Sequence, residues 1–176
     1  PDAAGIAWAR AQGIPALALD HKLYADREHF EGQLHAALTV AKVELVALAG
    51  FMRLMTAGFV DKWRDRMLNI HPSLLPSFKG LHTHERALAA GVRIAGCTVH
   101  LVRPEMDEGP ILGQAAVPVL DGDTPETLGA RVLAAEHRLY PAALRRFALG
   151  QAHVADGKVS YDPPSGLGET LFSPLS

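Results

Sequence analysis

The stretches Glu44-Leu-Val-Ala-Leu-Ala49 and Met67-Leu-Asn-Ile-His71 decide the fold. The first is a short, continuous apolar run, which is typical of a strand buried on both faces of a parallel sheet, and the second is expected to be the next strand. Between them, Thr56 can cap a short helix that carries Phe59 and Trp63. The order strand, helix, strand predicts an α/β fold with a mostly parallel central sheet and helices on both of its faces.

The rest of the chain continues this alternation. Helices are expected over residues 3–12, from Asp26 onward, over 84–90 and over 123–149, and strands over 15–19, 96–102 and 111–119. Pro141 predicts a kink or a break in the long C-terminal helix. Residues 153–161 read as a hairpin that turns at Asp156-Gly157. We expect one domain over residues 1–162 and a loose tail over residues 163–176, which are rich in Pro, Gly and Ser.

An ordinary globular composition excludes several classes of protein. The 176 residues are 48% apolar and 20% charged, and 17 basic and 19 acidic side chains give a net charge of −2. No run of Lys and Arg is present, so nucleic-acid binding lacks its electrostatic footprint. No apolar run approaches the ~18 residues of a membrane span, and no signal peptide is visible. The single Cys97 excludes an internal disulfide, so we expect a cytoplasmic protein.

The end of the run at residues 67–71 carries the first candidate chemistry. Ligands of open α/β sheets bind beyond the carboxyl ends of the strands. Asn69 and His71 lie two residues apart, so their side chains project to the same side of a strand. An amide can polarise a carbonyl oxygen and an imidazole can move a proton near neutral pH. The alternative is a polar strand end whose side chains only satisfy the backbone of a loop.

Asp107 is the second candidate, in the segment Asp107-Glu-Gly-Pro110. If its carboxylate reaches His71, it favours the charged form of the imidazole. The alternative is an ordinary turn residue.

A metal site is not expected. The pair His82-Thr-His84 and the strand residues Cys97 and His100 match no ligand spacing of a known metal site. Cys97 lies in the middle of an apolar strand, where a free cysteine packs as a small hydrophobic residue. Exposed or locally bonded side chains are expected for His29, His35 and His153.

The cluster Phe51-Met-Arg-Leu-Met55 has two interpretations. Its apolar side chains line a pocket for a flat ring, or they belong to the core, which is the commoner role. Arg53 is harder to explain as a core residue. The chain contains neither a Gly-x-Gly-x-x-Gly motif nor a Gly-x-x-x-x-Gly-Lys phosphate loop.

Several of these segments occur in a specific order, which makes the chain resemble the phosphoribosylglycinamide formyltransferase family from about residue 1 to about residue 160. The segments are Leu48-Ala-Gly-Phe-Met-Arg-Leu54, Asn69-Ile-His-Pro-Ser-Leu-Leu-Pro76, Lys79-Gly-Leu-His-Thr-His84, Gly96-Cys-Thr-Val-His100, Asp107-Glu-Gly-Pro110 and Glu136-His-Arg-Leu-Tyr-Pro141. The resemblance implies a Rossmann-like formyltransferase fold. It also implies transfer of a formyl group from 10-formyltetrahydrofolate, as cosubstrate, to the amine of glycinamide ribonucleotide in de novo purine biosynthesis.

The family's catalytic trio matches Asn69, His71 and Asp107. By that match, Asn69 holds the formyl oxygen as it becomes an oxyanion. His71 donates a proton when the tetrahedral intermediate breaks down, and Asp107 orients His71 and favours its charged form.

The family's binding residues also have counterparts here. The folate pocket matches Arg27, Met52, Arg53, Leu54, Met55, Asn69, Arg103, Pro104, Glu105 and Met106. The ribonucleotide site matches Leu133, Ala134, Ala135 and Glu136, with Glu136 expected on the ribose. His82 and His100 match histidines near the family's site, and the family's cis proline matches the bond between Leu75 and Pro76.

One departure and several alternatives remain. Family members begin with a strand and a Gly/Ser/Asn-rich loop that holds the substrate phosphate, and this chain starts after both. We therefore expect a chain that is incomplete at its N-terminus. Formyltetrahydrofolate hydrolase and methionyl-tRNA formyltransferase resemble the same core, and a non-catalytic folate-binding module is a third alternative. The expected partners are the two small-molecule substrates, with no nucleic acid and no membrane, and the expected assembly is a monomer or a homodimer.

Overall fold

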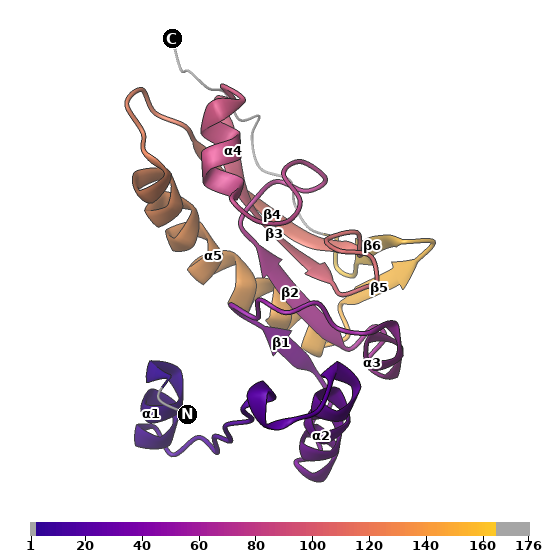
Figure 1. Ribbon diagram of the computed structural model, residues 1–176. Coiled ribbons are helices and arrows are strands. Elements are labelled where there is room, and N and C mark those ends of the chain that lie inside the picture. Colours follow the sequence, from indigo (N-terminus) through magenta and orange to yellow (C-terminus); the bar gives the residue numbers. More distant parts are fainter. Residues whose placement is uncertain (1–2, 165–176) are drawn as a thin grey trace. The chain divides into compact units, whose positions relative to one another are not determined.

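The computed structural model describes residues 3–164 and divides between Val43 and Glu44 into two compact units (Figure 1). The first unit contains the helix α1 (Ala4–Ala11), the short 3-10 helix η1 (His21–Leu23) and the helix α2 (Arg27–Val40). Asp26 begins α2 as expected, because its carboxylate accepts a hydrogen bond from the backbone N–H of His29 at 2.8 Å.

The strand predicted over residues 15–19 is wrong. These residues form no strand, and the side chain of Leu17 is 68% exposed. A strand needs a neighbour that accepts and donates its ladder hydrogen bonds. No strand among the described residues 3–164 pairs with this segment.

The second unit is built on a four-stranded sheet with the order β1-β2-β3-β4. The strands are β1 (Val46–Leu48), β2 (Met67–His71), β3 (Ile94–Leu101) and β4 (Ile111–Pro118). β1 and β2 are parallel, whereas β2–β3 and β3–β4 are antiparallel. The sheet is therefore mixed, and the predicted mostly parallel arrangement is wrong for the residues described.

The prediction rests on the apolar run at residues 44–49 and on the alternation of strands and helices, and neither of these fixes the direction of β3. Seven of the eight residues of β3 are buried, as in a strand that is covered on both faces, whichever way it runs. Here α5 (Pro125–Ala148) packs on one face of β2, β3 and β4 (Figure 1). Loops cover the opposite face of β3: Leu75 hydrogen-bonds to Thr98, and Asp107 contacts His100. A second layer of helices is thus not what buries β3 on that side.

Helices α3 (Ala57–Lys62), α4 (Thr83–Ala89) and α5 complete the unit. The side chains of Thr56 and Thr124 cap α3 and α5 by accepting hydrogen bonds from backbone N–H groups one turn ahead. Helix α5 runs through Pro141 without a break. Its buried residues Leu128 and Val132 pack against Cys97 in one part of the core.

The C-terminal hairpin agrees with the prediction. Strands β5 (Ala152–Ala155) and β6 (Lys158–Tyr161) are antiparallel. The two turn residues between them, Asp156 and Gly157, have φ angles of 50° and 72°, which a two-residue type I′ turn requires. The Tyr161 hydroxyl donates to the backbone oxygen of Leu112 and ties the hairpin to β4. Of the expected tail, residues 165–176 lie outside the described residues.

Candidate functional site

Four polar side chains lie together on one face of the central sheet. Strands β2 and β3 pair so that Asn69 is opposite His100 and His71 is opposite Thr98. Alternate residues of a strand point to the same face, so all four side chains share the face that α5 leaves uncovered. The two-residue spacing that singles out Asn69 and His71 in β2 therefore recurs in β3.

The imidazole of His71 lies between two oxygen acceptors. Its Nδ1 is 3.4 Å from Oδ2 of Asp107, and its Nε2 donates to the backbone oxygen of Phe78 at 3.1 Å. The side chains of His71 and Asp107 are only 7% and 9% exposed. A protonated imidazole can therefore direct an N–H toward an oxygen on both of its sides.

The turn that carries Asp107 is held against the end of β3. A Cβ atom on Gly109 would lie 1.6 Å from the backbone oxygen of Leu101, so only glycine permits this approach. Asp107 itself has a positive φ of 57°. Its Oδ2 accepts a hydrogen bond from the backbone N–H of Gly80 at 2.9 Å, which fixes the carboxylate beside His71.

His100 connects Asn69 to the same cluster. Nδ1 of His100 hydrogen-bonds to the backbone oxygen of Leu101 at 3.0 Å, and Nε2 lies 3.4 Å from Nδ2 of Asn69. Oδ1 of Asp107 is 3.7 Å from the same Nε2. Burial lowers the pKa of His100, and the hydrogen bond to Leu101 and the charge of Asp107 offset this only in part. A neutral ring that donates from Nδ1 leaves Nε2 as an acceptor for the Asn69 amide.

Thr98 and Gln114 support the loop that follows β2, and the sequence did not single out either residue. The Thr98 hydroxyl donates to the backbone oxygen of Ser73 at 2.7 Å and accepts from the backbone N–H of Leu75 at 3.0 Å. Nε2 of Gln114 donates to the backbone oxygen of Leu75 at 2.8 Å. The signal that could have identified Thr98 is its two-residue spacing from His100 in the segment Thr98-Val-His100.

The predicted cis bond between Leu75 and Pro76 is confirmed. A second cis bond joins Asp162 and Pro163. An open cavity of about 340 Å³ lies beside this cis proline and is also lined by Asp107. Its lining residues are Leu75, Pro76, Lys79, Asp107, Glu108, Gly109 and Ile111.

The comparison with known proteins assigns the family. The model of the Formyl transferase family matches residues 1–144. Phosphoribosylglycinamide formyltransferase of Escherichia coli (strain K12) is 40% identical over 169 residues, which are 94% of this chain and 80% of that protein. The chain belongs to the phosphoribosylglycinamide formyltransferase family.

Two further proteins are similar to this chain. The crystal structure of glycinamide ribonucleotide transformylase 1 from Symbiobacterium toebii has a TM-score of 0.89 and 48% identity, over 92% of this chain and 76% of that one. The trifunctional purine biosynthetic protein adenosine-3 of Gallus gallus is 51% identical over 158 residues, or 89% of this chain. The chain spans 16% of the length of that trifunctional protein.

The residues predicted to form a folate pocket are mostly exposed. Met52 and Leu54 are 76% and 59% exposed, so the interpretation as core is wrong for these two side chains, whereas Phe51 and Met55 are half-buried. Arg103 donates to Oδ1 of Asp65 at 2.5 Å and to the backbone oxygen of Val102, and Met106 is 51% exposed. Arg53, Pro104 and Glu105 lie in the same two loops. Arg27 is the exposed first residue of α2, in the other compact unit.

The residues predicted to form a ribonucleotide site are on α5. Leu133 is 48% exposed, and Ala134, Ala135 and Glu136 follow it in the helix. Burial raises the pKa of Glu136. Helix α5 packs on the face of β3 opposite the polar cluster, so these four residues are not part of that cluster. His82 is largely exposed and contacts Glu85 rather than the cluster.

The remaining expectations concern cysteine, metal and membrane. Cys97 is fully buried, and burial raises the pKa of its thiol to about 11, which confirms packing as a small hydrophobic residue. Within residues 3–164, no group of three or more His, Cys, Asp or Glu side chains is placed to hold a metal ion. In the same residues, no helix combines the length and the apolar character that crossing a membrane requires.

Proposed function

We propose that this formyltransferase moves a formyl group from 10-formyltetrahydrofolate to the amine of glycinamide ribonucleotide, a step of de novo purine biosynthesis. The observation that carries the proposal is the clustering of Asn69, His71 and Asp107 on one buried sheet face. The identity of the two substrates is inferred from the family to which the chain belongs. The reaction needs a donor for a developing oxyanion and a proton for a departing nitrogen, and the cluster offers both groups.

Asn69 is the proposed oxyanion donor. One N–H of its amide is directed toward Nε2 of His100, at 3.4 Å between the nitrogens, which orients the NH₂ group. The second N–H is then left for the formyl oxygen, which gains negative charge as the amine attacks the formyl carbon. A donor held in place before the reaction stabilises that charge without reorganising, and its loss typically costs ~10²–10³ in rate.

His71 is the proposed general acid. The tetrahedral intermediate breaks down by cleavage of the bond between the formyl carbon and the folate nitrogen N10, and this nitrogen needs a proton as it leaves. The attacking amine releases a proton in the same sequence, so the protons balance. Asp107, held by the N–H of Gly80, faces Nδ1 of His71 and orients the ring for proton transfer.

The binding roles are also proposals. Backbone groups of the loop from Met52 to Met55 are proposed to meet the pterin ring, with Arg53 and residues 103–106 completing the folate site. The segment from Leu133 to Glu136 is proposed to contact the ribonucleotide, with Glu136 on the ribose. We expect the cytoplasm as the compartment, small molecules as the partners, and a monomer or a homodimer as the assembly.

A formyl-transfer assay on the full-length protein tests the proposal. The substrates are glycinamide ribonucleotide and 10-formyltetrahydrofolate, or a 10-formyl-dideazafolate whose release is followed by absorbance. The variants His71→Ala and Asp107→Asn should lower the rate by about 10²–10⁴-fold, the range in which general acid–base groups act. His153→Ala, an exposed histidine on β5, is the matched control and should keep the wild-type rate.

Two outcomes would redirect the proposal. Release of formate that does not depend on the ribonucleotide would identify a formyltetrahydrofolate hydrolase, in which water replaces the amine. Folate binding without turnover in the wild-type protein would indicate a non-catalytic binding module. If the His71→Ala protein still formed product at the wild-type rate, the proposed substrates would stand, but His71 would not be the general acid.

A further inference from the structure

The loop over residues 78–82 has a backbone that its sequence does not favour. Phe78 and His82 have φ angles of 54° and 57°, and Gly80 between them has a φ of 78°. A bulky side chain such as Phe rarely adopts this left-handed conformation. Such residues persist where surrounding contacts over-determine them. The contacts that hold this loop therefore decide its geometry.

Two backbone groups of the loop contact the proposed catalytic pair. The oxygen of Phe78 accepts a hydrogen bond from Nε2 of His71 at 3.1 Å, and the N–H of Gly80 donates to Oδ2 of Asp107 at 2.9 Å. His71 and Asp107 also contact each other, with 3.4 Å between Nδ1 of His71 and Oδ2 of Asp107. A change in the conformation of the loop would move an acceptor of the imidazole and a donor to the carboxylate together.

Arg86 of α4 binds the backbone of this loop. The guanidinium of Arg86 donates to the backbone oxygen of Lys79 at 2.5 Å and lies 3.4 Å from that of Leu81. These two carbonyls flank Gly80 on either side. The same guanidinium lies over the ring of Phe78, 5.7 Å from its centroid. Arg86 thus contacts residues on both sides of the N–H that binds Asp107.

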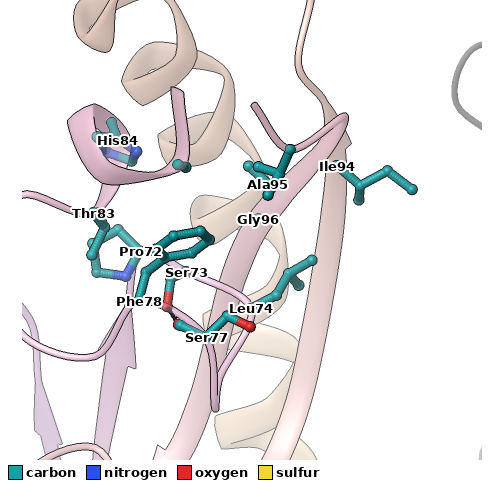
Figure 2. A pocket seen from close by; sticks show the side chains of 12 residues that line it. Pro72, Ser73, Leu74, Ser77, Phe78, Thr83, His84, Ile94, Ala95 and Gly96 are labelled. Atoms are coloured by element: carbon teal, nitrogen blue, oxygen red, sulfur yellow. Dashed lines mark hydrogen bonds between the residues drawn. The ribbon is translucent and has the colours of Figure 1, made fainter. Parts of the chain in front are cut away.

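The ring of Phe78 links Arg86 to His71, because the backbone oxygen of the same residue accepts the hydrogen bond from His71. It lines a cavity of about 110 Å³ between the loop after β2, helix α4 and the start of β3, together with Pro72, Thr83 and His84 (Figure 2). The ring is half-buried there, so it anchors the residue whose carbonyl oxygen binds His71. Arg86 covers the ring and fixes the next carbonyl along the chain.

We propose that Arg86 is a positioning residue, which holds the 78–82 loop so that His71 and Asp107 keep their mutual geometry. Its kinetic consequence rests on the proposed formyl transfer. The ion pair between Lys79 and Glu108, at 2.7 Å, also joins the two loops, but both side chains are substantially exposed. Exposed pairs of this kind contribute little. Arg86 is also exposed, but its guanidinium donates to backbone oxygens of the loop rather than to another mobile side chain.

The first test is steady-state kinetics of Arg86→Met and Arg86→Lys in the full-length protein. Arg86→Met keeps an apolar stem over Phe78 and removes every donor, so kcat should fall about 10–100-fold, the scale of an ångström-sized misplacement. KM for both substrates should stay within about twofold, because Arg86 lies outside the proposed binding residues. Arg86→Lys has a single ammonium for two carbonyls and should fall between Arg86→Met and the wild type.

The matched control is Arg64→Met, because Arg64 pairs with the carboxylate of Asp61 on the surface and does not touch the loop. It should keep the wild-type kcat. Lys79→Met should lower kcat less than Arg86→Met does. A kcat of Arg86→Met equal to that of Arg64→Met would overturn the proposal, as would a loss that appears only in KM. If Arg86→Met does not fold, the comparison of Arg86→Lys with Arg64→Met decides: a lower kcat in Arg86→Lys supports the proposal, and an equal kcat overturns it.

The second test does not depend on activity. The ring nitrogen resonances of His71, assigned by their loss in His71→Ala, report the hydrogen bond to Phe78 and the contact with Asp107. They should shift in Arg86→Met and not in Arg64→Met. Unchanged His71 resonances in a folded Arg86→Met protein would refute the positioning role. If the wild-type protein transfers no formyl group, these resonances still test the loop, so the two proposals fail separately.

Discussion

The two faces of β3 are equally buried and chemically opposite. Cys97, Val99 and Leu101 face α5 and belong to the two apolar clusters of the core. Thr98 and His100, which alternate with them, face the loops that follow β2 and β3, and they are just as buried. On the first face the partners are the apolar side chains of α5. On the second they are backbone groups and the side chains of Asn69 and Asp107.

This contrast shows that burial alone does not separate core from site. Burying a hydroxyl or an imidazole is unfavourable unless its polar atoms find partners. On the polar face of β3, Thr98 finds partners in the loop that follows β2, and His100 contacts Asp107 in the loop that follows β3 as well as Asn69 of β2. Polar residues at alternate positions of a buried strand therefore fix where the loops lie, and the loops in turn supply the groups that contact His71. The apolar face contributes stability without this directional information.

The largest effect is expected on the apolar face. Leu128 of α5 is fully buried against Cys97, so Leu128→Ala should lower the free energy of unfolding by about 2–5 kcal/mol. Leu133, on the same helix but 48% exposed, is the matched control, and Leu133→Ala should cost much less. Urea unfolding followed by circular dichroism measures both. Equal losses in the two variants would mean that α5 does not form the core in the way described.

The next largest effect is expected on the polar face, and in rate rather than in stability. Asn69→Ala removes the proposed oxyanion donor and should lower kcat by about 10²–10³-fold while the protein stays folded. Asn69→Asp keeps the size of the side chain but replaces the donor with a negative charge, so it should be at least as inactive. Formyl-transfer kinetics beside thermal melting measures the two properties. An Asn69→Asp protein with near wild-type activity would exclude an oxyanion role for this residue.

The sequence predicted β2 and the boundaries of most helices because their signals are local. A continuous apolar run, the caps at Thr56 and Asp26 and the Asp156-Gly157 turn each act within a few residues. The direction of β3 is not local, because it depends on which segment covers its second face. The apolar run alone fits helices or loops equally well, and the general preference for a parallel sheet gave the wrong direction.

The site was predictable to the extent that it depends on spacing. Asn69 and His71 stand out by the two-residue period, and Asp107 by its place before Gly109-Pro110. Thr98 was missed because a threonine in a strand is ordinary, and its three hydrogen bonds come from residues at least 16 positions away. Arg86 was missed for a similar reason, since its partners are backbone oxygens rather than side chains. Sequence patterns identify side chains, whereas the loop geometry depends on backbone acceptors.

Introducing an apolar residue on the polar face of β3, and a polar residue on its apolar face, tests the difference between the two faces. Thr98→Val removes the hydroxyl that binds Ser73 and Leu75 and leaves buried backbone groups without their partner, so it should cost about 1–3 kcal/mol of unfolding free energy. Val99→Thr places a hydroxyl among apolar side chains and should cost a similar amount. Both substitutions nearly conserve volume. If either variant were as stable as the wild type, the assignment of that face would be wrong.

The smallest expected effect is a difference in pH dependence between the two faces. Burial lowers the pKa of His100 below the ordinary value of about 6.5, whereas the unfolded chain keeps that value. Below pH ~6.5 the unfolded state therefore binds a proton that the native state does not, and stability falls as the pH drops toward the lowered native pKa. His84, whose pKa is also lowered by burial, adds a similar slope.

The melting temperature, measured between pH 8 and pH 5, should therefore change differently in variants of the two faces. His100→Gln removes one titrating group from the polar face and should flatten the fall of the melting temperature below pH ~6.5. Val99→Ala, on the apolar face, removes no titrating group and should lower the curve at every pH with its slope unchanged. His84→Gln should remove its own share of the slope in either background. A His100→Gln curve that stays parallel to the wild-type curve would mean that His100 titrates normally, and the polar face would then lose the neutral acceptor proposed to orient Asn69.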